Sequence, residues 1–246
     1  MRRTLVITDL TYMWADMVCI AGVGEDGECV RPIIEDGVRQ HHLFRDGLLL
    51  VYPRARVEFD LSPTEIRRPH IEDYTFTPES IVYHGACTDY EWENLLRRTA
   101  YRGIEELFDG LLEDGRRVPP DSFTKSLGTI ADVTADEVLV DESQGRRQFR
   151  MNFTDSTGKR YERYPINDLA FRAVMEKRIE LGSDVRDSEL AATKALKSIH
   201  RLYLRIGLAR PDVLGDYPEA CWTQITGVYT FPDYLKGKTF ADFSLV

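Results

Sequence analysis

The chain has few of the features that mark secreted, membrane-bound or metal-binding proteins. Its 246 residues include only four cysteines, which show neither C-x-x-C spacing nor the density of a disulfide scaffold. No stretch approaches the roughly 20 apolar residues of a membrane span, and the apolar run after Met1-Arg2-Arg3 is too short for a signal peptide. We therefore expect a cytoplasmic protein with reduced thiols and no membrane partner.

Complete motifs for cofactor binding and hydrolysis are also lacking. Residues 22–27 match G-x-G-x-x-G, but a strand-like segment follows where a dinucleotide fold needs a helix, so these glycines predict a hairpin turn. Gly237-Lys238-Thr239 resembles the end of a P-loop, but Pro232 stands in place of its first glycine. The sequence Glu-x-Lys, which would suit a nuclease site, does not occur. We therefore predict no catalytic residue, no metal site and no cofactor.

What the chain does contain is the composition of a globular protein with an excess of acid. Its apolar fraction of 43% can fill a core, and 41 acidic against 32 basic residues give a net charge of −9. An acidic protein repels polyanions over most of its surface. We therefore expect any nucleic-acid site to be a local basic patch.

Residues 193–210 reverse this sign locally, because they include five basic residues and no acid. Apolar residues at spacings of three and four predict a helix over residues 188–206, with cations on its outer face. These cations are Lys194, Lys197, Arg201 and Arg205. Such a face suits an anionic ligand, above all nucleic acid, which releases counterions when its phosphates are neutralised. The alternative is a cationic face that is only solvated.

A second basic patch is predicted in a β-hairpin with strands over residues 146–154 and 159–165. Alternation places its apolar side chains on one face and its cations on the other. We expect Tyr161 or Tyr164 on the exposed face, where a base could stack. The candidate nucleic-acid-binding residues of the hairpin are Arg146, Arg147, Arg150, Lys159, Arg160, Tyr161 and Arg163. Here too, the alternative is a solvated cationic face over an apolar core.

The remaining pattern predicts a mixture of strands and helices. Short β-branched runs separated by turns predict a β-meander over residues 3–61, and alternation predicts a late strand over residues 222–230. Apolar spacings of three and four predict a helix from Asp89 to Leu111 and another over residues 167–181. The chain therefore belongs to the α+β class.

Two polar segments complete the organisation. Residues 114–121 contain glycine and two prolines, which marks them as a linker or long loop and places a domain boundary nearby. The acidic cluster within residues 132–142 is expected in a solvated loop, where it would repel nucleic acid. We therefore divide the chain into residues 1–118 and 119–246.

Three segments together resemble a known family: Val18-Cys19-Ile20-Ala21-Gly22 leading to Val30-Arg31-Pro32, Arg205-Ile206-Gly207-Leu208-Ala209-Arg210-Pro211, and Cys221-Trp222-Thr223-Gln224-Ile225-Thr226-Gly227-Val228-Tyr229-Thr230. They resemble the prokaryotic dual OB-containing domain proteins, over nearly the whole chain. The resemblance implies two OB-type barrels in one polypeptide. It also implies a sensor of nucleic acid or nucleotides in prokaryotic conflict systems, with no established catalytic residues.

The resemblance has consequences for particular positions. Within the resembling segments it implies contacts to an anion from Arg31, Arg205, Arg210, Thr226 and Tyr229. It further implies that residues 203–209 form a barrel strand, which competes with the helix that apolar spacing predicts there. Both alternatives stay open at this point.

Together these patterns predict an α+β fold of two small OB-like β-barrels or curled antiparallel sheets with helical insertions. The first unit would carry one helical insertion and the second two helices. The predicted function is non-catalytic binding or sensing of nucleic acid or a nucleotide. One alternative is a small-molecule enzyme acting on a phosphorylated or nucleoside substrate, with Arg31 or Arg210 as an anion clamp. Another is an adaptor whose basic helix meets an acidic protein partner.

Overall fold

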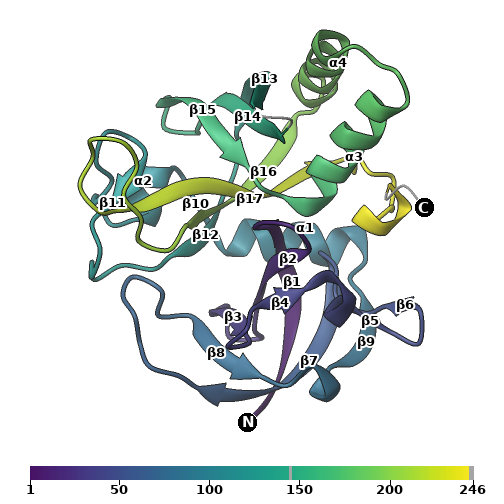
Figure 1. The fold of residues 1–246 in the computed structure, drawn as a ribbon, viewed down its shortest axis with the longest axis vertical. Coiled ribbons are helices and arrows are strands. Elements are labelled where there is room, and N and C mark those ends of the chain that lie inside the picture. The colour runs from purple at the N-terminus through teal and green to yellow at the C-terminus, as the bar shows by residue number, and fades with distance from the viewer. Residues whose placement is uncertain (144–145, 244–246) are drawn as a thin grey trace.

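Most of the described strands form two curled sheets, one in the lower and one in the upper half of Figure 1. The computed structural model describes residues 1–143 and 146–243, and about 44% of the chain is strand and 20% helix. The first sheet comes from the N-terminal part of the chain and the second from the C-terminal part. The predicted α+β class with a small barrel and curled sheets is confirmed.

The first sheet closes on itself as a five-stranded barrel. Around the barrel the order is β1 (Arg2–Tyr12), β2 (Met17–Val23), β3 (Cys29–Ile33), β8 (Asp73–Phe76) and β7 (Ala55–Pro63). β7 pairs back with β1, and all neighbours are antiparallel except β3 and β8. β1 serves two partners because its first residues pair with β7 and its later ones with β2. An irregularity between Ile7 and Asp9 bends it between the two.

Short elements complete the N-terminal half. The connection from β3 to β7 contains β4 (Val38–Arg39), the 3-10 helix η1 (Gln40–Leu43), and the hairpin of β5 (Phe44–Arg45) and β6 (Leu48–Leu49). After β8, η2 (Pro78–Ser80) leads to β9 (Val82–Ala86), which pairs with β7. The predicted hairpin turn at residues 22–27 is confirmed, because Gly24 N–H donates to the Glu28 carbonyl at 2.9 Å and Gly27 adopts φ +87°.

The second sheet repeats the strand order of the barrel. Five of its strands follow one another as β13 (Thr134–Ser143), β14 (Arg146–Thr154), β15 (Arg160–Ile166), β17 (Cys221–Phe231) and β16 (Arg201–Leu208). Among these five, only β15 and β17 are parallel, as β3 and β8 are in the barrel. The sheet also contains β10 (Ala100–Tyr101), β11 (Arg117–Val118) and β12 (Leu127–Ile130). The predicted hairpin and late strand are both confirmed.

The two sheets differ in how the strand that begins the five-strand order is connected to the strand that ends it. In the barrel a single strand, β1, pairs on both sides, whereas in the second sheet β12 pairs with β16 and β13 pairs with β14. Residues 131–133 separate β12 from β13. Asp132 adopts φ +53° there, and Val133 N–H donates to the Leu202 carbonyl at 3.2 Å. The second sheet therefore curls around its core and returns to β16 through a bend.

Helix α4 (Val185–Lys197) covers the edge of β13 that faces away from β14. Thr193 Oγ1 accepts a hydrogen bond from the backbone N–H of Val138 at 2.9 Å. Glu189 Oε1 accepts one from the N–H of Val140 at 2.6 Å. Two side chains thus satisfy backbone donors that a neighbouring strand would otherwise satisfy.

The predicted helix over residues 188–206 is wrong in its second half, because α4 ends at Lys197 and β16 begins at Arg201. Leu202, Leu204 and Ile206 belong to the core of the second sheet, and they alternate with Tyr203 and Arg205, which contact the first sheet or the cluster between the sheets. A strand that is buried on both faces carries a continuous apolar run, which imitates helical spacing. The alternative of a strand over residues 203–209 is therefore the correct one up to Leu208.

The other two predicted helices differ in how closely their predicted bounds match the structure. α3 (Leu169–Glu180) confirms the helix over residues 167–181. The helix after Asp89 ends earlier than predicted: α1 (Asp89–Arg98) gives way to β10, and α2 (Ile104–Leu107) is separate. A Cβ at Gly103 would lie 2.3 Å from Asp155 Oδ2, so this backbone passes too close to the second sheet for most side chains. Among the described residues, no helix combines the length and the apolar character that crossing a membrane requires.

Apolar side chains pack between the two sheets. Trp92 and Leu96 of α1 form one buried cluster with Tyr203 and Tyr229 of the second sheet and Val23 of the first. The rings of Trp92 and Tyr229 meet edge to face, with centroids 5.0 Å apart. Each sheet also encloses a core of its own. The described chain ends with η3 (Phe240–Asp242), which packs near α3.

Candidate functional site

The cations of the predicted hairpin contact an acidic strand. Arg150 Nε and Arg163 Nη2 donate to the carboxylate of Asp141 at 2.5 and 2.6 Å. Arg147 Nε donates to Glu142 at 2.8 Å. The solvated loop expected over residues 132–142 is therefore wrong for most of its length, because β13 pairs with β14 and places its carboxylates against the hairpin cations.

Two more hairpin cations have acidic neighbours. Lys159 pairs with Glu105 of α2, and Arg160 Nε lies 3.8 Å from Asp136. Arg146 is exposed at the start of β14. Surface pairs of this kind contribute less than about 1 kcal/mol each, but they offset the positive potential that would attract a phosphate backbone. The hairpin is thus less basic than its sequence suggests.

Tyr161 and Tyr164 lie in the core of the second sheet. They are 3% and 1% exposed, and Tyr161 stacks on Phe153 with ring centroids 5.2 Å apart. The prediction of an exposed tyrosine is wrong because β15 is irregular: its register against β14 shifts between Met151 and Phe153, and Arg163 adopts φ +53°. The shift turns two residues that are three positions apart toward the same face. Neither ring is accessible for stacking on a base.

The change from helix to strand separates the four cations of the predicted helix. Lys194 and Lys197 are exposed in the last turn of α4. Arg201 begins β16, and its Nη1 donates to both carboxylate oxygens of Glu93 on α1 at 2.6 and 2.7 Å. Arg205 is fully buried. The prediction that these cations share one helical face is wrong.

Arg205 lies in a buried polar cluster between the sheets. Its Nε donates to Asp9 Oδ2 on β1 at 2.9 Å, and Thr226 Oγ1 donates to the other Asp9 oxygen at 2.5 Å. Tyr229 OH donates to the carbonyl of Thr8 at 2.8 Å. Protein groups thus already bind three of the residues for which the family resemblance implies contacts to an anion.

Arg31 and Arg210 share a second carboxylate near the same contact. Arg31 Nη1 and Arg210 Nη2 donate to the two oxygens of Asp73 at 3.0 and 2.6 Å. Arg31 Nη2 also donates to Ser126 Oγ at 2.6 Å, and the Ser126 hydroxyl donates to Glu72 at 2.8 Å. Breaking a buried ion pair costs about 3–5 kcal/mol. An external anion would have to compete with Asp73, so anion binding by these two arginines stays a prediction.

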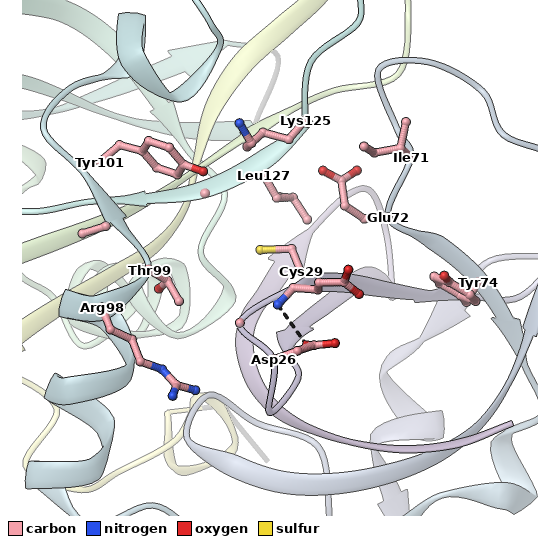
Figure 2. Close-up of a pocket in the computed structure, with 14 residues that line it drawn as sticks. Asp26, Cys29, Ile71, Glu72, Tyr74, Arg98, Thr99, Tyr101, Lys125 and Leu127 are labelled. Atoms are coloured by element: carbon pink, nitrogen blue, oxygen red, sulfur yellow. Dashed lines mark hydrogen bonds between the residues drawn. The ribbon is translucent and has the colours of Figure 1, made fainter.

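A cleft of about 700 Å³ opens between the two sheets beside these buried clusters (Figure 2). Its lining residues come from four parts of the chain, within residues 26–29, 71–74, 98–101 and 125–128. Figure 2 shows Arg98 and Tyr101 on one side of the cleft and Tyr74 and Glu72 on the other. Its volume falls within the range of roughly 300–1,000 Å³ that is usual for small-molecule sites.

The carboxylates of the cleft are held by other protein groups. Arg3 Nη2 lies 3.0 Å from Asp26 and 3.4 Å from Glu28. Glu72 accepts hydrogen bonds from the hydroxyl and the backbone N–H of Ser126. Each of these carboxylates therefore has a partner within the protein, although Asp26 and Glu28 share one arginine and stay exposed.

The cations of the cleft are less engaged. Among the described residues, Arg98 has no ion-pair partner, and Lys125 makes only a long contact of 3.6 Å with Asp109. Lys125 Nζ also lies 5.1 Å from the centroid of the Tyr101 ring. The cleft therefore offers a ligand two cations next to aromatic side chains, on a wall that also carries Asp26, Glu28 and Glu72.

The thiols do not support the enzyme alternative. Burial raises the pKa of Cys29, in the wall of the cleft, and of Cys87, and it raises that of Cys221 to about 11. Because the thiolate is the reactive form, these groups are weak nucleophiles at neutral pH. Within the described part of the chain, no group of three or more His, Cys, Asp or Glu side chains is arranged to hold a metal ion.

No family model matches the chain, and no curated protein matches it significantly. The resemblance to the dual OB-containing domain proteins therefore rests on its three sequence segments. The cleft itself has no sequence signal, because its four lining segments lie far apart in the chain. Arg98 alone, at the end of an amphipathic helix, is indistinguishable in sequence from a solvated charge. Only the packing of the two sheets brings it near Lys125 and Tyr101.

Proposed function

We propose that the protein binds a nucleotide, free or as part of a single strand of nucleic acid, in the cleft between its two sheets. The observation that carries this proposal is the presence of two weakly engaged cations, Arg98 and Lys125, beside Tyr74 and Tyr101 in one cavity. Cations neutralise a phosphate, and aromatic rings stack on a base. The same cavity therefore offers a partner to each end of a nucleotide.

In this proposal, different ends of the ligand meet different walls of the cleft. Arg98 extends from the end of α1 toward the cavity, and its guanidinium can form two parallel hydrogen bonds with a phosphate. Lys125, held against Tyr101, adds a second charge. Tyr74 and Ile71 across the cleft form the apolar surface for the base. The ligand would thus span the two sheets.

The strand order supports the further proposal that both sheets are OB-type barrels. Such barrels are five-stranded Greek keys that bind oligonucleotides on an open face. In the first sheet β1, β2 and β3 form consecutive hairpins, and β7 returns to lie beside β1, which is a Greek-key order. The second sheet repeats this order, with β12 and β13 in the place of β1. Two related units would then form the cleft between them.

The test is a titration with mononucleotides, the corresponding nucleosides, and labelled single-stranded DNA and RNA, each at two salt concentrations. We expect mononucleotides to bind more tightly than nucleosides, with an affinity that falls as salt rises. Calorimetry measures the small ligands and fluorescence anisotropy the strands. Binding of strands alone would identify a polymer as the ligand, and absence of binding to any of these ligands would overturn the proposal.

A matched pair of variants locates the site. Arg98→Met should weaken mononucleotide binding by roughly tenfold or more and leave nucleoside binding unchanged, because a charged hydrogen bond to the phosphate is lost. The control is Arg97→Met, since Arg97 is its exposed neighbour on α1 and donates to Asn94 instead of lining the cleft. Equal losses in the two variants would indicate a general charge effect and contradict the assignment of Arg98.

We propose that the protein acts as a sensor without catalysis. This agrees with the role in prokaryotic conflict systems that the sequence resemblance implies. The same nucleotides distinguish a sensor from an enzyme. Nucleotides incubated with the protein should be recovered unchanged by chromatography. Conversion of a bound nucleotide at a rate that depends on Arg98 would instead favour an enzyme acting on this ligand.

A further inference from the structure

A second cavity, of about 250 Å³, lies apart from the cleft, and no residue lines both. Its walls come from the turn before β7, the end of β9, α1, α3, the end of β17, the segment between β17 and η3, and η3 itself. The segment between β17 and η3 contains Gly237-Lys238-Thr239, which resembles part of a P-loop without being one. This segment therefore lines a cavity, although it does not form a phosphate-binding loop.

The walls of this second cavity are rich in aromatic side chains. Trp92 and Tyr229 line it and contact each other edge to face, and Tyr52, Phe231 and Phe240 also line it. Its volume is below the roughly 300 Å³ at which pockets for larger ligands begin. An occupant with one ring, or two fused rings, matches such a space, whereas a base, a sugar and a phosphate together do not.

Lys238 is the charged group of the second cavity that is least engaged by other protein groups. Arg54, Lys238 and Asp233 line the cavity, and Arg54 pairs with both Asp89 and Asp233. Asp233 already accepts hydrogen bonds from the backbone N–H groups of Leu235 and Gly237, at 2.9 and 2.8 Å, and lies 3.7 Å from Arg54. Within residues 1–143 and 146–243, Lys238 has no ion-pair partner. One negative charge on a ligand would give Lys238 a partner.

We propose that this second cavity binds a small aromatic acid, that is, a planar ring carrying one carboxylate. The ring would lie against Trp92 and Phe231, and the carboxylate would meet Lys238 at the mouth, with Arg54 beside it. The proposal does not depend on nucleotide binding, because the two cavities share no residue. It assigns the protein a second ligand of a different chemical class.

The test uses benzoate and follows the indole N–H signals of the three tryptophans by NMR. Trp14 is 61% exposed and lies outside the cavity, so benzoate should shift the signal of Trp92 and leave that of Trp14 unchanged. Trp92→Phe identifies the signal by removing it. Benzamide has the same shape without charge, and cyclohexanecarboxylate has the charge without the aromatic ring. Both should bind at least tenfold more weakly than benzoate.

A charge variant distinguishes this site from non-specific binding. Lys238→Met should weaken benzoate binding to the level of benzamide, whereas Lys236→Met should not, because Lys236 does not line the cavity. Both lysines are exposed, so neither variant should lower the melting temperature. Failure of benzoate to shift the Trp92 signal, or equal binding of benzoate and benzamide, would overturn the proposal. Neither outcome would affect the nucleotide titrations, which test the other cavity.

Discussion

Arginines in two adjacent regions of this protein have opposite environments. In the seam, by which we mean the buried polar contacts between the two sheets, Arg205 is fully buried and donates to Asp9 of the other sheet. In the cleft beside it, Arg98 is exposed and, among the described residues, has no ion-pair partner. This difference shows that the role of an arginine in this protein depends on whether folding places a carboxylate next to it. The first kind holds the sheets together, and the second is available to a ligand.

The largest effect should come from breaking the seam. Arg205→Met leaves the Asp9 carboxylate buried with only hydroxyl donors, Thr8 and Thr226, so the free energy of unfolding should fall by about 3–5 kcal/mol. Urea unfolding measures this loss. The matched control is Arg201→Met on the same strand, whose pair with Glu93 is exposed and should contribute less than about 1 kcal/mol. Similar losses in the two variants would contradict the distinction between buried and exposed arginines.

A second prediction concerns two buried residues near the contact between the sheets, His70 and Asp168, that titrate in opposite senses. Burial, together with Arg31 and Arg210, lowers the pKa of His70 to about 4. The unfolded chain, with a histidine pKa of about 6.5, therefore takes up the proton first, and stability falls as the pH drops from about 6.5 to 4. Burial raises the pKa of Asp168 to about 6. Here the folded protein takes up the proton first, and stability rises as the pH drops from about 6 to 4.

Each of these two effects is about 3 kcal/mol, so together they should nearly cancel between pH 6.5 and 4. His70→Gln should leave the Asp168 effect, and the variant should become more stable relative to wild type as the pH falls. Asp168→Asn should show the opposite trend. Urea midpoints measured from pH 7 to pH 4.5 give both slopes. Parallel curves for the two variants would show that neither group titrates as its burial requires.

The smallest effects are expected in the hairpin. Its arginines have acidic partners, like the arginines of the seam, but they are partly exposed, like Arg98 in the cleft. Arg163→Met removes hydrogen bonds to Asp141 and should cost about 1 kcal/mol or less. Nucleotide affinity should not change, because the hairpin does not line the cleft. If Arg163→Met weakened binding as much as Arg98→Met, the ligand would lie on the hairpin and the proposed site would be wrong.

Elements with a clear local pattern could be predicted from the sequence. The hairpin of β14 and β15 follows from alternation on either side of a polar turn, and α3 follows from apolar spacing ended by Gly182. β16 could not be predicted in this way, because both of its faces are buried and its apolar run fits a helix as well as a strand. The family resemblance alone pointed to a strand there.

The candidate site depended on information that local patterns do not contain. Counting charges along the chain favours Arg150 and Arg205, which lie in basic stretches, over Arg98. Asp141 pairs with the first across two strands, and Asp9 pairs with the second from 196 positions away. Neither contact has a signature in sequence spacing. The inward orientation of Tyr161 likewise results from an irregularity in β15 that alternation cannot foresee.

The side chains of α4 that reach β13 also bear on how the protein behaves among its own copies. A strand edge with unsatisfied N–H groups is a template on which a second chain can add a strand. Glu189 and Thr193 occupy the N–H groups of Val140 and Val138, so this edge is closed to such addition while α4 is docked. Helix α4 therefore protects the protein against aggregation, and undocking of this one helix would open a route to self-association.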